Sequence, residues 1–249
     1  MSTFCLKTYE KLLLSLRESG RSFRLFTEEP QNGLLLRLDV DFDLKWAASL
    51  AVENQKLGIR GTFFVHLTSP FYNALTPKSR QALKRITEAG QSIGLHYHHL
   101  GGELDVQQLK REYEILRTIS PTAERVIAWH NPRGALEPLV AAARVAGFLS
   151  AYAEEFYGAD KYISDSNCER LPEEILEFAT KTTSPLVQVL LHPVNWVMGG
   201  KSMRDVLVRA FKVKFDQLIE GFETNRIWKS GLGQEILSQM SASPWYSEE

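Results

Sequence analysis

Acidic and imidazole side chains follow several short apolar runs of this sequence. Asp39 and Asp41 come at the end of the run 34–40, which is rich in leucine. Carboxylates and neutral imidazoles bind zinc and similar divalent metals, and they also act as general acids and bases. The chain has six histidines, and each falls at or just past the end of a predicted strand: His66, His96, His98, His99, His130 and His192. This placement predicts a site that combines metal binding with proton transfer.

The two acids lie two residues apart on one predicted strand, so both carboxylates project to the same side. Without a cation between them they would repel each other, and the pKa of one would rise. The alternative is that Asp39 or Asp41 merely caps the following helix. Asp43 occupies the better capping position, which weakens that alternative. We therefore expect the acids to share a metal and a water molecule.

Three histidines within four positions follow a third predicted strand. His96 and His98 would face the same side if this strand extends that far, whereas His99 would reach the site only from a turn. A lone histidine is more often structural, but this cluster and the acids together favour metal binding. His192 ends the apolar strand 186–191 and is placed to act as a general acid. His130, taken alone, would be interpreted as a half-buried structural histidine, but it shares its placement at a strand end with His192, which argues against that interpretation.

Strands alternate with helices along the chain, which is typical of a parallel sheet built from βα units. The units are too many for a small open sheet, so a closed or nearly closed α/β barrel is the predicted fold. In such barrels the active site lies at the C-terminal ends of the strands. A single domain is expected over 1–249, with an N-terminal helix at 3–19 and a helical segment at 201–240. The expected strands are 34–41, 59–65, 91–97, 125–129, 148–152 and 186–191.

Composition excludes several classes of protein. The chain has 249 residues, 44% of them hydrophobic, and a formal net charge of -1, so no charge excess favours binding to nucleic acid. Two cysteines exclude a disulfide framework and the usual cysteine-rich zinc sites. No signal peptide is recognised, and no apolar stretch is long enough to span a bilayer. We expect a cytoplasmic protein without membrane insertion.

The motifs together resemble those of the polysaccharide deacetylase family, the NodB-homology or carbohydrate esterase family 4 group. The resemblance covers about residues 34–196 and is nearest to the cytoplasmic branch associated with surface-polysaccharide (O-antigen-type) biosynthesis. Five segments carry it: 36–42 (LRLDVDF), 90–99 (GQSIGLHYHH), 130–134 (HNPRG), 162–166 (YISDS) and 191–192 (LH). The fold it implies is a distorted (β/α) barrel with about seven strands.

The resemblance also implies a role for each matching residue. Asp39 would be the catalytic base, and His192 the general acid that Asp165 tunes. Asp41 and His96 would bind one divalent metal ion, expected to be zinc. The implied reaction is removal of an N-acetyl group from a sugar or glycan intermediate.

Two positions depart from the family pattern. The family's second histidine follows four residues after the first, where this chain has Leu100. Either His98 or His99 would then be the remaining ligand. The arginine of the third motif is replaced by His130, so His130 or Arg133 would have to serve as the partner of Asp39.

Substrate contacts are expected from His130, Arg133 and Trp196. Trp129 and Trp196 could present an apolar face to the sugar ring, although core packing is an equal alternative for both. Two other functions stay open: a metal-dependent amidase acting on another C–N bond, and an inert relative that binds a sugar or a partner protein. The sequence does not indicate an oligomeric state.

Overall fold

The computed structural model describes residues 3–29, 32–101, 103–132, 134, 136–223 and 225–241. The chain falls into two compact units, Met1–Val206 and Leu207–Glu249. The sequence predicts one domain because no Pro-, Gly- or Ser-rich linker separates them. The first unit holds the sheet and the predicted site. The second holds most of α8 (Met203–Phe222), a π-helical turn (Trp228–Leu232) and α9 (Gly233–Ser241).

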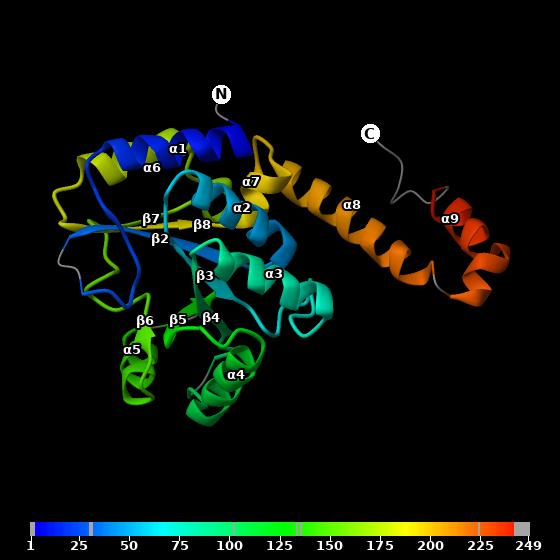
Figure 1. The fold of residues 1–249 in the computed structure, drawn as a ribbon, viewed down its shortest axis with the longest axis horizontal. Coiled ribbons are helices and arrows are strands. Elements are labelled where there is room, and N and C mark those ends of the chain that lie inside the picture. The colour runs from blue at the N-terminus through cyan, green and yellow to red at the C-terminus, as the bar shows by residue number, and fades with distance from the viewer. Residues whose placement is uncertain are drawn as a thin grey trace. The chain divides into compact units, whose positions relative to one another are not determined.

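Seven parallel strands form the sheet of the first unit in the order β6-β5-β4-β3-β2-β8-β7, and β1 pairs with β2 outside this path. The sheet curls toward a barrel (Figure 1). The barrel is incomplete, because β6 and β7 at its two ends do not pair within the described residues. This confirms the distorted (β/α) barrel. The strands are β1 (Phe23–Arg24), β2 (Gly33–Val40), β3 (Thr62–Val65), β4 (Ser92–His98), β5 (Val126–His130), β6 (Leu149–Ser150), β7 (Tyr162–Ser164) and β8 (Leu186–Leu191).

Helices flank the sheet on its outer face (Figure 1). Of the residues whose helical spacing predicts α1, Tyr9, Leu12, Leu13 and Leu16 are buried, whereas Leu6 is exposed. A large outer core joins the helices to the outward side chains of the strands. The helices of the first unit are α1 (Leu6–Glu18), α2 (Leu44–Lys56), α3 (Pro77–Glu88), α4 (Val106–Ile119), α5 (Leu136–Val145), α6 (Pro172–Lys181) and α7 (Pro193–Met198), with a 3-10 turn at Ser166–Cys168.

The start of α2 is fixed by a side chain near the site. Asp43 accepts a hydrogen bond from the backbone N–H of Lys45 at 2.7 Å, which satisfies one of the unpaired donors at the start of α2. Asp39 and Asp41 are therefore not needed as helix caps. This agrees with the capping role that the sequence assigns to Asp43.

The inner face of the sheet forms a small apolar core below the strand ends. The register pairs Asp39 with Phe64, and Phe64 with Gly94. A Cβ atom at Gly94 would lie 2.7 Å from the Phe64 ring, so only glycine leaves room for that ring. Phe64 packs with Leu35 and Ala128 in this inner core. The polar residues that come next along the strands therefore pack directly above this inner apolar core.

β1, β7 and α7 were not predicted from the sequence. β7 is only three residues long, and its partner is the buried β8, so it needs no apolar run of its own. α7 is six residues long and begins with Pro193 directly after His192. Proline suits the first position of a helix because the missing N–H would have no helical partner there. Within the described residues, no helix is both long and apolar enough to span a membrane.

Candidate active site at the C-terminal ends of the strands

Two rows of polar side chains cross the inner face of the sheet where the strands end. Val65 pairs with both Val40 and Leu95 in the register. The next residues along these three strands are Asp41, His66 and His96, which form the first row. Because side chains alternate along a strand, all three project to the face that carries Asp39 and Phe64. The second row is the registered pair of His98 on β4 and His130 on β5.

Asp41, His96 and His130 form the cluster that best fits a divalent metal. Each offers one ligand atom, and these atoms all lie within 4.8 Å of one another. Oδ1 of Asp41 is 3.2 Å from Nε2 of His96 and 3.3 Å from Nδ1 of His130. One carboxylate and two imidazoles are a donor set that zinc accepts, with positions left for water or substrate. The chemistry of these residues thus fits the predicted metal.

Hydrogen bonds orient both imidazoles. Nδ1 of His96 lies 3.1 Å from the carbonyl oxygen of Ala128, which only an N–H can approach as a hydrogen-bond donor. Nε2 of His96 is therefore unprotonated in the neutral ring and points to the cluster. Nε2 of His130 accepts from Nδ2 of Asn131 at 3.1 Å, so Nδ1 carries the proton and donates it to Nε2 of His96 at 3.1 Å; this proton must leave before Nδ1 can bind a metal. Asn131 has φ 44, in the left-handed region that asparagine tolerates better than most residues.

His98 and His99 contribute no ligand atom to this cluster. His98 is exposed at the end of β4, and its ring centroid is 5.0 Å from that of His130. His99 is buried just beyond the strand. Among the described residues, the grouped ligand atoms come from His130 and not from either of these two histidines. The sequence left His98 and His99 as alternatives for the second histidine ligand. The structure adds His130 as a third candidate.

Asp39 is paired with Arg37, which precedes it on the same face of β2. Nε and Nη2 of Arg37 donate to Oδ1 and Oδ2 of Asp39 at 2.8 and 2.7 Å. Both side chains are almost fully buried, at 0% and 3% exposure. Burial alone would raise the pKa of Asp39, but Arg37, together with the nearby His96 and His192, outweighs it and lowers that pKa below its usual value. Asp39 is therefore ionised at neutral pH.

The role of Arg37 was missed in the sequence, where His130 or Arg133 is expected to partner Asp39. Arg133 lies outside the described residues, and His130 contacts Asp41 and His96 instead. The available signal was an arginine inside a buried apolar strand, which requires a nearby carboxylate. The spacing of two residues between Arg37 and Asp39 places both on one face.

His192 and Asp165 form a second buried pair. Nδ1 of His192 lies 2.6 Å from Oδ1 of Asp165. The backbone N–H of His192 also donates to both carboxylate oxygens, at 3.0 and 3.1 Å. Burial opposes the imidazolium, but Asp165 more than compensates and raises the pKa of His192 to about 9. The other ring nitrogen, Nε2, lies 3.8 Å from Oδ2 of Asp41, so His192 faces the cluster.

Trp196 supports this pair and lies in the core. Its Nε1 donates to Oδ2 of Asp165 at 2.8 Å. The ring is fully buried and packs against Phe4 and Tyr9, with centroids 5.1 and 5.4 Å away. The structure therefore gives Trp196 a role in holding Asp165, in place of the expected sugar contact. Trp129 is likewise buried, at 1% exposure.

An aromatic pair lies beside the cluster and was not singled out in the sequence. Phe42 follows Asp41 directly, and its ring stacks on Phe71 with centroids 4.2 Å apart and planes 12° from parallel. Phe71 is exposed and Phe42 is half-buried. The loop that carries Phe71 is held to β2, since Oγ of Ser69 donates to the carbonyl oxygen of Asp41 at 2.6 Å. The pair offers a partly exposed apolar surface next to Asp41 in the chain.

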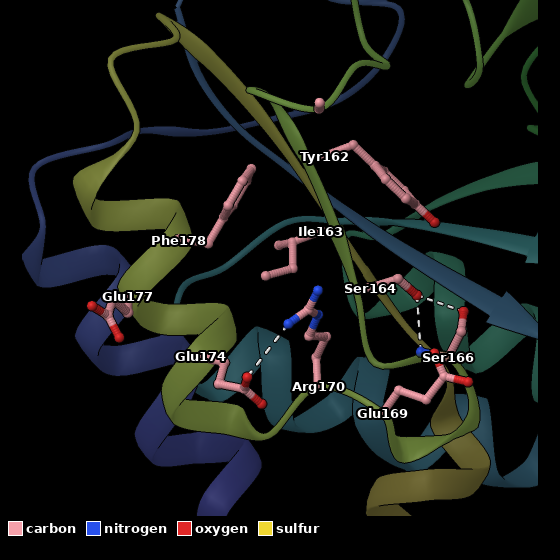
Figure 2. Close-up of a pocket in the computed structure, with 10 residues that line it drawn as sticks. Tyr162, Ile163, Ser164, Ser166, Glu169, Arg170, Glu174, Glu177 and Phe178 are labelled. Carbon is pink, nitrogen blue, oxygen red and sulfur yellow. Dashed lines mark hydrogen bonds and ion pairs between the residues drawn. The ribbon is translucent and has the colours of Figure 1, made fainter.

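A separate cavity of about 610 Å³ lies between β7 and α6 (Figure 2). Ser164 and Ser166 line it on either side of Asp165 in the chain, with their hydroxyl oxygens 2.6 Å apart. Figure 2 shows Arg170 and Glu174 facing each other across the cavity wall, and their side chains form an ion pair of 3.5 Å. The cavity is lined by β7, α6 and the turn between them, so it is distinct from the Asp41 cluster.

The sequence matches no family model and no curated protein. Solved structures similar to this chain include a CE4 family pseudoenzyme from Bacillus anthracis, at 15% identity and a TM-score of 0.48 over 76% of this chain and 63% of that one. A peptidoglycan deacetylase of Bdellovibrio bacteriovorus is 12% identical, with a TM-score of 0.47 over 80% of this chain and 54% of that one. The chain thus spans less than two thirds of the length of these two proteins.

A chitin deacetylase of the fungal pathogen Colletotrichum lindemuthianum is 16% identical to this chain. The TM-score is 0.45, over 77% of this chain and 86% of that one. At these values the assignment of a function rests on the site itself.

Proposed function

We propose that this protein is a metal-dependent hydrolase that removes an N-acetyl group from a sugar or glycan intermediate. One observation carries the proposal: a metal-type cluster of Asp41, His96 and His130 adjoins both the buried carboxylate of Asp39, which pairs with Arg37, and the imidazole of His192, which pairs with Asp165. Hydrolysis of an amide needs these three functions together, because water must be activated and the amine must leave protonated.

The proposed metal ligands are Asp41, His96 and His130. A divalent ion held there would supply Lewis acidity, polarising the acyl oxygen and making water easier to deprotonate. The deacetylase family uses a histidine at the position of Leu100, and His130 takes over that function in this proposal. The loss of the family's arginine at position 130 is then balanced by Arg37. In this proposal His130 thus supplies the ligand that Leu100 cannot provide, and Arg37 supplies the partner of Asp39 that His130 cannot provide.

Asp39 is the proposed base. Arg37 keeps it ionised and fixes the plane of its carboxylate through two hydrogen bonds. Oδ2 of Asp39 lies 3.6 Å from Nε2 of His96, so the carboxylate borders the metal ligands and can accept a proton from a water molecule beside them. A carboxylate fixed in this way loses little entropy in the reaction.

His192 is the proposed general acid. Asp165 holds the proton on Nδ1, so Nε2 faces the cluster and donates its own proton to the departing amine. Trp196 and the backbone N–H of His192 fix the carboxylate of Asp165 in turn. This arrangement keeps His192 charged at neutral pH, which is the form that a leaving amine requires.

The stacked pair of Phe42 and Phe71 supports a sugar as the substrate. The apolar face of a pyranose ring packs on aromatic rings, and Phe42 of this pair directly follows Asp41 in the chain. We also propose the cytoplasmic setting and the role in surface-polysaccharide biosynthesis that the sequence motifs imply. His130 acts as a metal ligand in this proposal, in place of the substrate contact first expected for it.

The test is acetate release by the zinc-loaded protein from a panel of N-acetylated nucleotide sugars and lipid-linked glycans. Asp39→Asn serves as the control, because it removes the base and keeps the ligands. Release from at least one sugar, lost in the control, supports the proposal. Release from simple N-acetyl amides alone would indicate a different C–N hydrolase. Zinc binding without release from any substrate would indicate an inert relative.

A further inference from the structure

His66 is the member of the first polar row that the proposed mechanism does not use. It follows β3 directly, between Asp41 on the β2 side and His96 on the β4 side. Its side chain is buried, at 1% exposure. Neither ring nitrogen has a hydrogen-bond partner among the described residues. A buried imidazole with both nitrogens unpaired is costly, and such groups generally have an ion or a water molecule as partner.

The neighbours of His66 show where that partner would lie. Its ring centroid is 4.6 Å from that of His130 and 5.7 Å from that of His96. Oδ1 of Asp41 contacts both of these imidazoles, at 3.3 Å from His130 and 3.2 Å from His96. The unpaired imidazole of His66 thus lies beside two of the three grouped residues on the inner face of the sheet.

The backbone of His66 is fixed by contacts that do not involve its ring. Its N–H donates to the hydroxyl oxygen of Tyr72 at 3.0 Å, and that hydroxyl donates to the carbonyl oxygen of Val40 at 2.9 Å. The imidazole therefore has no part in holding the loop. A structural role of the side chain would be met equally well by an apolar residue of similar volume.

We propose that His66 is an additional ligand of the metal site, so that three imidazoles and the carboxylate of Asp41 bind the ion. This rests on the proposed function only in placing the metal at Asp41, His96 and His130. The chemistry of the set is that of a zinc-type ion with mostly nitrogen ligands. A hard ion such as magnesium, which prefers oxygen ligands, is disfavoured by it.

The experiment is competition for zinc between a chromophoric chelator and four proteins: unmodified, His66→Leu, Tyr72→Phe and His130→Leu. Loss of an outer partner of a ligand already costs about 10–100-fold in metal affinity, so loss of a ligand should cost about 100-fold or more. We expect this loss in His66→Leu and His130→Leu. Tyr72→Phe removes the hydroxyl that holds the same loop and keeps the imidazole, so its zinc affinity should be unchanged.

X-ray absorption by the zinc-loaded, unmodified protein gives a second measurement that requires no variant. Three imidazoles around zinc are expected, and two would overturn the inference. Equal losses of affinity in His66→Leu and Tyr72→Phe, or no loss in His66→Leu, would also overturn it.

The failure of this inference is distinguishable from that of the proposed function. Three imidazoles on zinc without acetate release would refute the function and keep His66 as a ligand. Two imidazoles with acetate release would do the reverse. A protein that binds no zinc would contradict both.

Discussion

Replacing Arg37 by methionine should destabilise the protein strongly, because it leaves the carboxylate of Asp39 buried without its partner. Two charge-assisted hydrogen bonds, of 2.8 and 2.7 Å, are lost. Methionine keeps an apolar stem against the Tyr152 ring, which lies 4.6 Å from the guanidinium carbon. Breaking a buried ion pair by removing one partner typically costs about 3–5 kcal/mol, and we expect a loss of this size in the free energy of unfolding.

The loss of stability in Arg37→Met should depend on pH, in a direction set by the pKa of Asp39. In the unmodified protein Arg37 lowers the pKa of Asp39, so the pair contributes stability above the unfolded pKa of the carboxyl and loses it as the pH falls through the lower, folded value. In Arg37→Met burial is no longer opposed by Arg37, and the pKa of Asp39 rises. The variant should therefore regain stability, relative to the unmodified protein, as the pH is lowered from 7 to 5.

The assay is urea unfolding of metal-free protein, followed by circular dichroism at both pH values. The double variant Arg37→Met/Asp39→Leu is the matched control, because it removes both charges and leaves only the neutral acceptors Gln188 and Tyr152 without the donor that Arg37 supplied. It should be more stable than Arg37→Met alone. A loss below about 1 kcal/mol in Arg37→Met, or a double variant no more stable than the single one, would refute the reasoning.

Three further predictions concern the proton transfers and the metal. Asp39→Asn should abolish turnover and keep zinc, whereas Asp41→Asn should lose both, since an amide is a poorer ligand; equal zinc loss in both, measured by metal analysis, would contradict this. His192→Ala should slow amide hydrolysis about a hundredfold or more, and hydrolysis of an activated aryl acetate much less; equal slowing would make His192 structural. The basic limb of the rate profile should lie above the pH at which an ordinary imidazole loses its proton, because Asp165 raises the pKa of His192 and His192 must stay protonated. Asp165→Asn should move this limb to lower pH, and an unmoved limb would exclude the pairing.

The fold could be predicted because the sequence patterns follow strand and helix geometry directly. The apolar run of β2 ends at Asp39 and Asp41, and a period of two places both on the inner face. The short β7 and α7 could not be predicted in this way. Their positions depend on pairing with β8 and on the chain direction after His192, which are properties of the assembled barrel.

From local patterns, the sequence could predict which residues of the site lie at the end of each strand, but not which residues of different strands come together. The pairing of His192 with Asp165 was expected from the motif positions, and the structure gives it a distance of 2.6 Å. The placement of His130 beside Asp41 depends on the register between β4 and β5, which no local pattern encodes. Trp196 faces the core because α7 turns it inward, and the unpredicted helix is the reason that its role differs.

The central claim is that Asp41, His96 and His130 hold the metal of a hydrolytic site. Anomalous diffraction at the zinc edge, from crystals of the zinc-loaded protein, tests it most directly. The account predicts one strong peak in contact with the Asp41 carboxylate and with the imidazoles of His96 and His130. A peak bound by His98 and His99 without His130, or no peak at this end of the strands, would contradict it.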